Sequence, residues 1–276
     1  MSKDFFRKTS ELAEKGEPFA TATVVHTEGS CSAKNGSKAI VQEDGTTLFG
    51  WVGGGCVESQ VSEAALESLR DGQARTVEVD LESEVAGMPC GGKMKVFVEP
   101  HLPKETVVVL GHGPIAETVA RLAHQLGFSV AVDDPLATPE KYPGAESLVT
   151  DDADFAKAPV DSGSYVVITT QHHADDKALA AVMPKRPRYI ALVASKMRSA
   201  IVLNDLAEAG VSREELLKVR APAGLDLGAA TPEEIALAIV GEIVTVRRGG
   251  SGKPLVEVKG HPLLELRVVE PAGRDA

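Results

Sequence analysis

The sequence predicts an α/β protein in which a smaller, strand-rich α+β domain precedes a doubly wound parallel sheet. Short β-branched strands and glycine turns fill residues 1–101, whereas apolar strands alternate with helices from residue 106 onward. Alternation of this kind is typical of βαβ units. A proline-containing linker separates the two patterns. We therefore predict one domain at 1–101, a second at 106–248 and a tail at 249–276.

The first domain is predicted to be a small sheet with two helices. Its strands are recognised by β-branched residues and by the turns that bound them, such as the Asp44-Gly45 hairpin turn. Helical spacing of Phe5, Leu12 and Ala13 predicts the first helix. The expected helices are 4–15 and 59–69, and the expected strands are 19–26, 37–41, 46–52, 75–80 and 94–99.

The second domain is predicted from continuous apolar runs, which are typical of strands buried on both faces of a parallel sheet. Thr231, Pro232 and Glu234 form a capping box that should start the last long helix. The expected strands are 106–110, 129–132, 165–168 and 189–193, and the expected helices are 115–126, 175–182, 200–209 and 232–247.

Composition narrows the classes of function. The chain has 276 residues, a net charge of −11, 4% aromatic residues and three cysteines. The acidic charge argues against nucleic acid and against an anionic membrane surface as partners, because both require clustered basic residues. Three cysteines are too few for a disulfide framework. With no signal peptide and no long apolar segment, we expect a cytoplasmic protein.

A glycine turn follows the first strand of the second domain. Gly111, His112 and Gly113 open a GxGxxA sequence in which the second glycine lets a pyrophosphate approach the backbone. Asp133 ends the next strand, where a ribose-binding acid is expected. The pattern predicts a nucleotide site. NAD fits this site better than NADP, because no basic side chain follows the acid to bind a 2′-phosphate. Alternatively, a Rossmann-like turn here holds a different ligand or none.

Two cysteines lie in glycine-rich segments of the first domain. Cys56 lies just before the N-terminus of a predicted helix, whose dipole would favour its thiolate, and Cys90 lies in a loop. Their spacing is not a zinc signature. The alternative is two unrelated tight turns with inert thiols. The glycines that expose the backbone beside these thiols are Gly53, Gly54, Gly55, Gly91 and Gly92.

A polar cluster follows the third strand of the second domain. His172, His173 and Asp176 could bind a metal or transfer protons. The simpler interpretation, which we favour, is a polar loop with Asp175 or Asp176 as the N-cap of the next helix. Lys196, after the following strand, could hold an anion, or it could belong to a solvated helix start.

Several stretches together carry a family pattern. They are ATVVHTEGS at 22–30, Gly36, GWVGGGCVES at 50–59, GMPCGGKMKVFVEP at 87–100, VVVLGHGPIA at 107–116, VAVDDP at 130–135, YIALVASKM at 189–197 and APAGLDLGAATPEEIALAIVGEIV at 221–244. This combination resembles the XdhC/CoxF (CoxI) family, whose members are accessory proteins of molybdenum hydroxylases. The pairing of GGGCxE and CGG with a Rossmann domain is its most specific part.

The resemblance implies a protein that binds the molybdenum cofactor and supports its sulfuration with a cysteine desulfurase. It implies delivery of the cofactor to the apo-form of xanthine dehydrogenase or a related molybdenum hydroxylase. Such a protein is a carrier or chaperone more than a turnover enzyme, and a homodimer is expected to shield the reactive ligand. Cys56, Glu58 and Cys90 match family positions and are candidates for cofactor or sulfur handling, since thiolates are soft ligands.

The chain departs from the family pattern at its expected ligand clefts. A proline and an arginine are missing from the segment 29–36. Thr170-Gln171 stands where Thr-His is usual, Ala194-Ser195 where Gly-Ser is usual, and no arginine follows Asp133-Asp134. The alternatives to a cofactor carrier are an NAD(P)-dependent oxidoreductase and a nucleotide-sensing interaction module.

Overall fold

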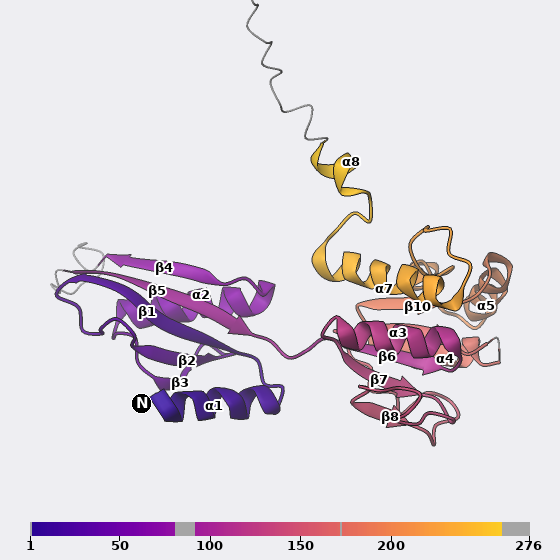
Figure 1. Ribbon diagram of the computed structural model, residues 1–276, viewed down its shortest axis with the longest axis horizontal. Coiled ribbons are helices and arrows are strands. Elements are labelled where there is room, and N and C mark those ends of the chain that lie inside the picture. The colour runs from indigo at the N-terminus through magenta and orange to yellow at the C-terminus, as the bar shows by residue number, and fades with distance from the viewer. Residues whose placement is uncertain (1, 81–91, 172, 261–276) are drawn as a thin grey trace, which may run out of the picture. The chain divides into compact units, whose positions relative to one another are not determined.

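The computed structural model describes residues 2–80, 92–171 and 173–260 and divides the chain into two compact units, Met1–Lys104 and Glu105–Ala276 (Figure 1). The first unit contains an antiparallel five-stranded sheet and the second a parallel six-stranded sheet. This confirms the predicted fold class. Within the described residues, none of the helices is both long enough and apolar enough to cross a membrane.

The first unit is a sheet with one helix on each face. The sheet has the order β3-β2-β1-β5-β4. Ala20, Ala22 and other small residues face α2, whereas Phe19 and Ile40 point to the opposite face and pack with α1. The elements are α1 (Ser2–Glu14), β1 (Phe19–Gly29), β2 (Lys38–Gln42), β3 (Thr47–Gly50), α2 (Cys56–Asp71), β4 (Arg75–Asp80) and β5 (Gly92–His101).

The second unit is a doubly wound parallel sheet with the strand order β11-β10-β9-β6-β7-β8. Its elements are β6 (Thr106–Gly111), α3 (Pro114–Gln125), β7 (Ser129–Asp133), β8 (Ser147–Val149), β9 (Tyr165–Thr169), α4 (Asp175–Val182), the 3₁₀ helix η2 (Met183–Lys185), β10 (Tyr189–Leu192), α5 (Lys196–Glu208), α6 (Arg213–Leu216), β11 (Val219–Arg220), α7 (Pro232–Arg248) and α8 (Leu255–Lys259).

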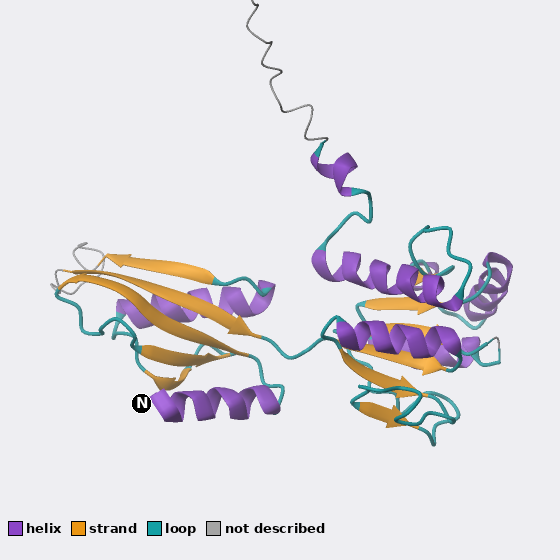
Figure 2. Ribbon diagram, viewed as in Figure 1, coloured by secondary structure: helices purple, strands orange, loops and turns teal. Residues whose placement is uncertain are grey.

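Both faces of the parallel sheet are covered by helices, which explains its continuous apolar strands. Figure 2 shows the helices that flank this sheet. Successive residues of β6 point to opposite faces of the sheet and so enter two separate cores: Val107 and Val109 pack with α3 and α7, whereas Val108 and Leu110 pack with α4 and α5. The predicted capping box starts α7, with the Thr231 side chain accepting from the Glu234 N–H. This helix is held against α3 through the first core.

The chain winds in opposite directions from the central strand β6. It continues to β7 on one side, and β9 pairs with β6 on the other side. In open α/β sheets, such a reversal leaves a crevice outside the carboxyl ends of the two strands at the reversal. Gly111 at the end of β6 and Thr169 at the end of β9 are paired in register and mark this crevice.

Several boundaries differ from the predictions. Helix α2 begins at Cys56, three residues before the predicted start, because Gly55 adopts a φ of 59° and turns the chain into the helix directly. Helix α5 begins at Lys196 because Ser195 caps it. The elements β8, α6 and β11 were not predicted, because segments this short do not show a recognisable spacing of hydrophobic residues.

Replacing Gly111 with alanine should destabilise the second unit. A Cβ atom at Gly111 would lie 2.6 Å from the Thr169 carbonyl oxygen, and the φ of 104° already disfavours any other residue. We expect a loss of about 2 kcal/mol or more in the free energy of unfolding. Urea denaturation measures it, and G163A is the matched control because its added Cβ meets only an ordinary contact at 3.5 Å. Equal stability of the two variants would contradict the close approach of β6 and β9.

Candidate functional site

A cavity of about 410 Å³ lies at the crevice between the carboxyl ends of β6 and β9. The turn after β6, the segment after β9 and the end of β10 all contribute to it. Its position is the usual place for a ligand in a doubly wound sheet. The lining residues are His112, Gly113, Pro114, Ile115, Thr169, Gln171 and Val193.

The N-terminus of α3 opens into this cavity. Gly113 is the N-cap and provides no side-chain cap, and Pro114 occupies the first turn without a backbone N–H. The first hydrogen bond of the helix runs from the Glu117 N–H to the Gly113 carbonyl oxygen at 3.0 Å. The N–H groups of the preceding turn have no acceptor within the helix, so this end of α3 attracts an anion.

Gln171 closes over the glycine turn from the other side of the crevice. Its Nε2 atom lies 2.6 Å from where a Cβ on Gly113 would be, and it donates a long hydrogen bond of 3.5 Å to the His112 carbonyl oxygen. Its backbone has a φ of 53°, in the left-handed region that glutamine rarely adopts. In the sequence, Gln171 stands out only as a departure from the family pattern.

Asp133 ends β7, as predicted, but its side chain is fully buried. Neither carboxyl oxygen has a hydrogen-bond donor among the described residues, and Asp152 lies beside it. Burial, reinforced by the charge of Asp152, raises the pKa of Asp133 to about 7. The pKa of Asp152 is lowered instead, because the N–H groups of Lys157 and Asp154 stabilise its carboxylate. Asp133 is therefore the acid of this pair that takes up a proton as the pH falls below about 7, and its buried side chain does not line the crevice.

Both carboxylate oxygens of Asp134 accept hydrogen bonds from within the second unit. Its Oδ1 atom accepts from the Leu136 N–H at 2.9 Å, and its Oδ2 atom accepts from the Tyr142 hydroxyl at 3.2 Å. Burial and the nearby Asp134 carboxylate raise the pKa of Tyr142 above its usual value. The acid pair after β7 thus shapes the turn in the described structure.

The polar loop after β9 forms a buried network. Asp175 is 1% exposed and accepts from the Thr170 hydroxyl and from the Arg198 guanidinium at 3.2 Å. It is the first residue of α4 and not its N-cap, because Ala174 holds that position without a side-chain cap, which corrects our expectation. The remaining candidates of this region, His173, Asp176 and Lys196, are exposed, and His172 lies outside the described residues.

In the first unit, the glycine run brings Cys56 to the first position of α2. Gly53 has a φ of 133°, and a Cβ there would lie 3.0 Å from the Val57 side chain, which is buried. Gly54 has open space around it, and Gly55 is the N-cap. The resulting turn leaves Cys56 half-buried against the first-unit core, while Glu58 is exposed in the first turn of α2, where its charge complements the helix dipole.

Cys31 has a defined contact that no sequence motif indicates. Its Sγ atom donates to the carbonyl oxygens of Glu28 and Lys93, each at 3.4 Å. A Cβ on Gly92 would lie 2.8 Å from the same sulfur, so a glycine is required at the start of β5. Cys31 packs against the same core as Cys56. Cys90 and Gly91, predicted beside Gly92, lie outside the described residues.

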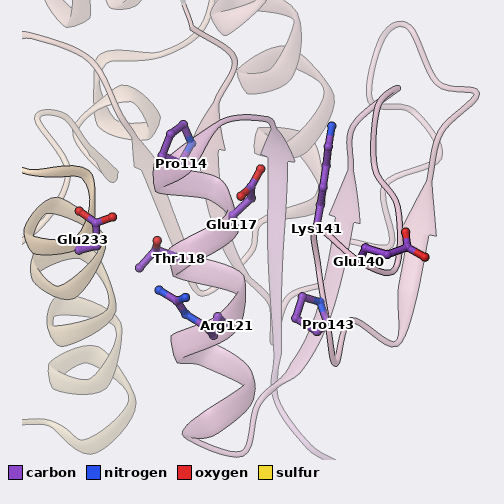
Figure 3. A pocket seen from close by; sticks show the side chains of 8 residues that line it. All are labelled: Pro114, Glu117, Thr118, Arg121, Glu140, Lys141, Pro143 and Glu233. Carbon is purple, nitrogen blue, oxygen red and sulfur yellow. The ribbon is translucent and has the colours of Figure 1, made fainter.

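A second cavity, of about 460 Å³, lies along α3 and shares Pro114 with the first (Figure 3). Glu117 and Arg121 reach it from α3, Lys141 from the turn after β7, and Glu233 from the start of α7. Its walls therefore carry both signs of charge. Over the described ranges, no group of three or more His, Cys, Asp or Glu side chains is arranged to hold a metal ion.

These features define a class of protein: a strand-rich unit with a cysteine at a helix start, followed by a Rossmann-type unit with a crevice at the N-terminus of α3. Residues 12–80 match the model of the XdhC and CoxI family, and residues 107–243 match the model of the XdhC Rossmann domain. The chain belongs to the XdhC and CoxI family. The resemblance drawn from the sequence is thereby confirmed.

Three curated relatives support this assignment. The uncharacterized protein YqeB of Escherichia coli (strain K12) is 30% identical over 278 residues, which cover 96% of this chain and 50% of that protein. The molybdenum cofactor insertion chaperone PaoD of the same organism is 24% identical, with 89% and 88% covered. A protein of Bacillus subtilis (strain 168) described as a probable xanthine dehydrogenase subunit is 29% identical over 162 residues, with 55% and 46% covered.

The chain thus spans about half the length of YqeB and of the Bacillus subtilis protein, and most of PaoD. A crystal structure described as a xanthine dehydrogenase from Bacillus halodurans is similar with a TM-score of 0.49 and 23% identity. The match covers 91% of this chain and 98% of that chain.

The buried acid Asp133 should make stability depend on pH. Because its folded pKa of about 7 lies above the value near 4 of an unfolded aspartate, its stabilising contribution is complete below about pH 4, falls as the pH rises from 4 to 7 and is lost above 7. D133N does not titrate, so the stability of D133N relative to the wild type should rise between pH 5 and pH 8. With about 1.4 kcal/mol per pKa unit as the scale, we expect a change of roughly 1–3 kcal/mol.

Urea denaturation of both proteins at several pH values measures this difference. D176N is the matched control, because Asp176 is exposed and lies on the same unit. Curves for D133N and the wild type that stay parallel from pH 5 to pH 8 would show that Asp133 ionises normally.

Proposed function

We propose that this chain is an accessory factor that binds the molybdenum cofactor as its cargo, supports its sulfuration and delivers it to a molybdenum hydroxylase of the xanthine dehydrogenase type. The family membership and the description of PaoD as an insertion chaperone support this proposal. The Bacillus subtilis relative, whose description names xanthine dehydrogenase, supports the class of client.

The observation that carries the proposal is the crevice of the second unit. The cofactor consists of a pterin with a dithiolene that holds molybdenum and a side chain that ends in phosphate. The free N–H groups at the start of α3, beside His112 and Gly113, suit that phosphate. None of the described residues that line the cavity has an acidic side chain that would repel it.

The thiols of the first unit suit the sulfur chemistry of the proposed function. Cys56 is a free cysteine, half-buried at the first position of α2. Three glycines precede it, and their lack of side chains leaves the backbone beside the thiol accessible. A thiolate is a soft ligand that matches molybdenum and sulfide. We assign Cys56 and Cys90 to sulfur handling, together with Glu58 in the same helical turn as Cys56, and we expect a cysteine desulfurase to supply the sulfur. Free thiols of this kind are maintained in the cytoplasm.

We further propose that the protein works as a homodimer, which would shield the cargo before transfer. The reaction that consumes the cargo takes place in the client enzyme, so the chain itself is a carrier. An NAD(P)-dependent oxidoreductase remains the alternative that uses the same glycine turn, and turnover of NADH with a carbonyl substrate would reveal it.

The test is recovery of the cargo. The full chain is produced together with the cofactor pathway, purified without oxygen, and analysed for molybdenum by elemental mass spectrometry and for pterin by fluorescence after oxidation. We expect both in a fixed ratio to the protein. Protein that carries neither molybdenum nor pterin would refute the proposal.

Replacing Cys56 and Cys90 with serine should lower cofactor retention severalfold, because the soft ligands are lost while the size of the side chains is kept. The same measurement of molybdenum per chain gives the result. C31S is the control, since its hydroxyl can still donate to the carbonyl oxygens of Glu28 and Lys93. Unchanged retention in C56S/C90S would remove these thiols from the mechanism and leave the second-unit crevice as the binding element.

A further inference from the structure

The glycine turn of the second unit has the sequence of a dinucleotide site, but the end of one side chain stands where the pyrophosphate of a dinucleotide would lie. Such a site needs two contacts besides the helix N-terminus. The pyrophosphate must approach the backbone of the second glycine, and an acid at the end of the next strand must reach a ribose hydroxyl. Both contacts can be examined in this chain.

The space needed for the first contact is filled by a side chain. The Nε2 atom of Gln171 sits 2.6 Å from the Cβ position of Gly113, the space that the missing side chain would otherwise leave for a pyrophosphate. The amide is held there by its hydrogen bond to the His112 carbonyl oxygen. Gln171 is exposed on its outer side, so the amide lies between Gly113 and solvent.

The acid needed for the second contact is buried. The Asp133 side chain has no exposed surface, and Asp152 lies beside it inside the unit. The Asp134 oxygens already accept from the Leu136 N–H and from the Tyr142 hydroxyl. Neither acid after β7 is therefore free to bind a ribose.

What stays open is the first turn of α3. The Ile115 side of this turn lines the cavity, and the Gln171 amide stands across from it as a further neutral donor. A terminal phosphate has three oxygens that can accept from such donors at once, whereas the diester oxygens of a pyrophosphate bridge would have to displace the amide.

From this arrangement we infer that the crevice selects a ligand that ends in a phosphate monoester over a pyrophosphate-linked dinucleotide, and that Gln171 is the residue that determines this selectivity. The inference rests on the proposed function, because it specifies the form of the cargo: a pterin that ends in a single phosphate, and not one extended to a dinucleotide. It also separates this crevice from NAD sites built on the same turn.

NAD⁺ and its two halves form a matched set of probes. Isothermal titration calorimetry of the full chain should show binding of inorganic phosphate, AMP and nicotinamide mononucleotide, with NAD⁺ weaker than AMP by about tenfold or more. In Q171G the amide is removed and glycine tolerates the positive φ, so the affinity for NAD⁺ should approach or exceed that for AMP. Q171N, which keeps an amide on a shorter side chain, should retain part of the preference.

Q125A is the control, because Gln125 lies at the far end of α3, and thermal unfolding of each variant checks its folding. Wild-type protein that binds NAD⁺ as tightly as AMP would overturn the inference, as would a preference unchanged in folded Q171G or the absence of binding by every probe at millimolar concentration. Cofactor recovery is measured separately. A phosphate preference without molybdenum in the purified protein would refute the proposed function and leave the selectivity of the crevice intact.

Discussion

The close approach of β6 and β9 at Gly111 is the constraint on which the second unit depends. The missing side chain allows the backbone of Gly111 to lie against the Thr169 carbonyl group, with no room for even a methyl group. This contact fixes the register of the two strands at the reversal of the sheet and places the turn 112–114 opposite the segment that contains Gln171. The crevice, the orientation of α3 and the position of the Gln171 amide all follow from it.

In the first unit, too, glycines leave space for neighbouring side chains. Gly92 leaves space for the Cys31 sulfur, and Gly53 leaves space for Val57 at the start of α2. In each case a glycine lets a side chain or a helix come close to the sheet, and a cysteine is thereby held half-buried at a defined place. Glycine-rich segments around a thiol therefore indicate close packing here, in addition to an accessible backbone.

The sequence predicted the long elements because their periodicity is strong. The strand TVVVL and the capping box at Thr231 are local signals, and both were found as expected. The side-chain environment of the site could not be predicted in the same way. The raised pKa of Asp133 depends on its burial and on Asp152, 19 positions further along the chain, and the place of Gln171 depends on Gly113 in another βα turn. Such contacts arise only when separate strands meet at one edge of the sheet.

Charge explains why neutral groups dominate the crevice. The chain carries a net charge of −11, so a phosphate approaches against long-range repulsion that only local donors can offset. Two buried acids of this unit have reduced negative charge. Asp133 takes up a proton, and Asp175 is paired with Arg198. Because burial raises the pKa of Asp133 to about 7, its charged form is unfavourable inside the unit. The stability of this unit should therefore decline as the pH rises from about 4 to 7.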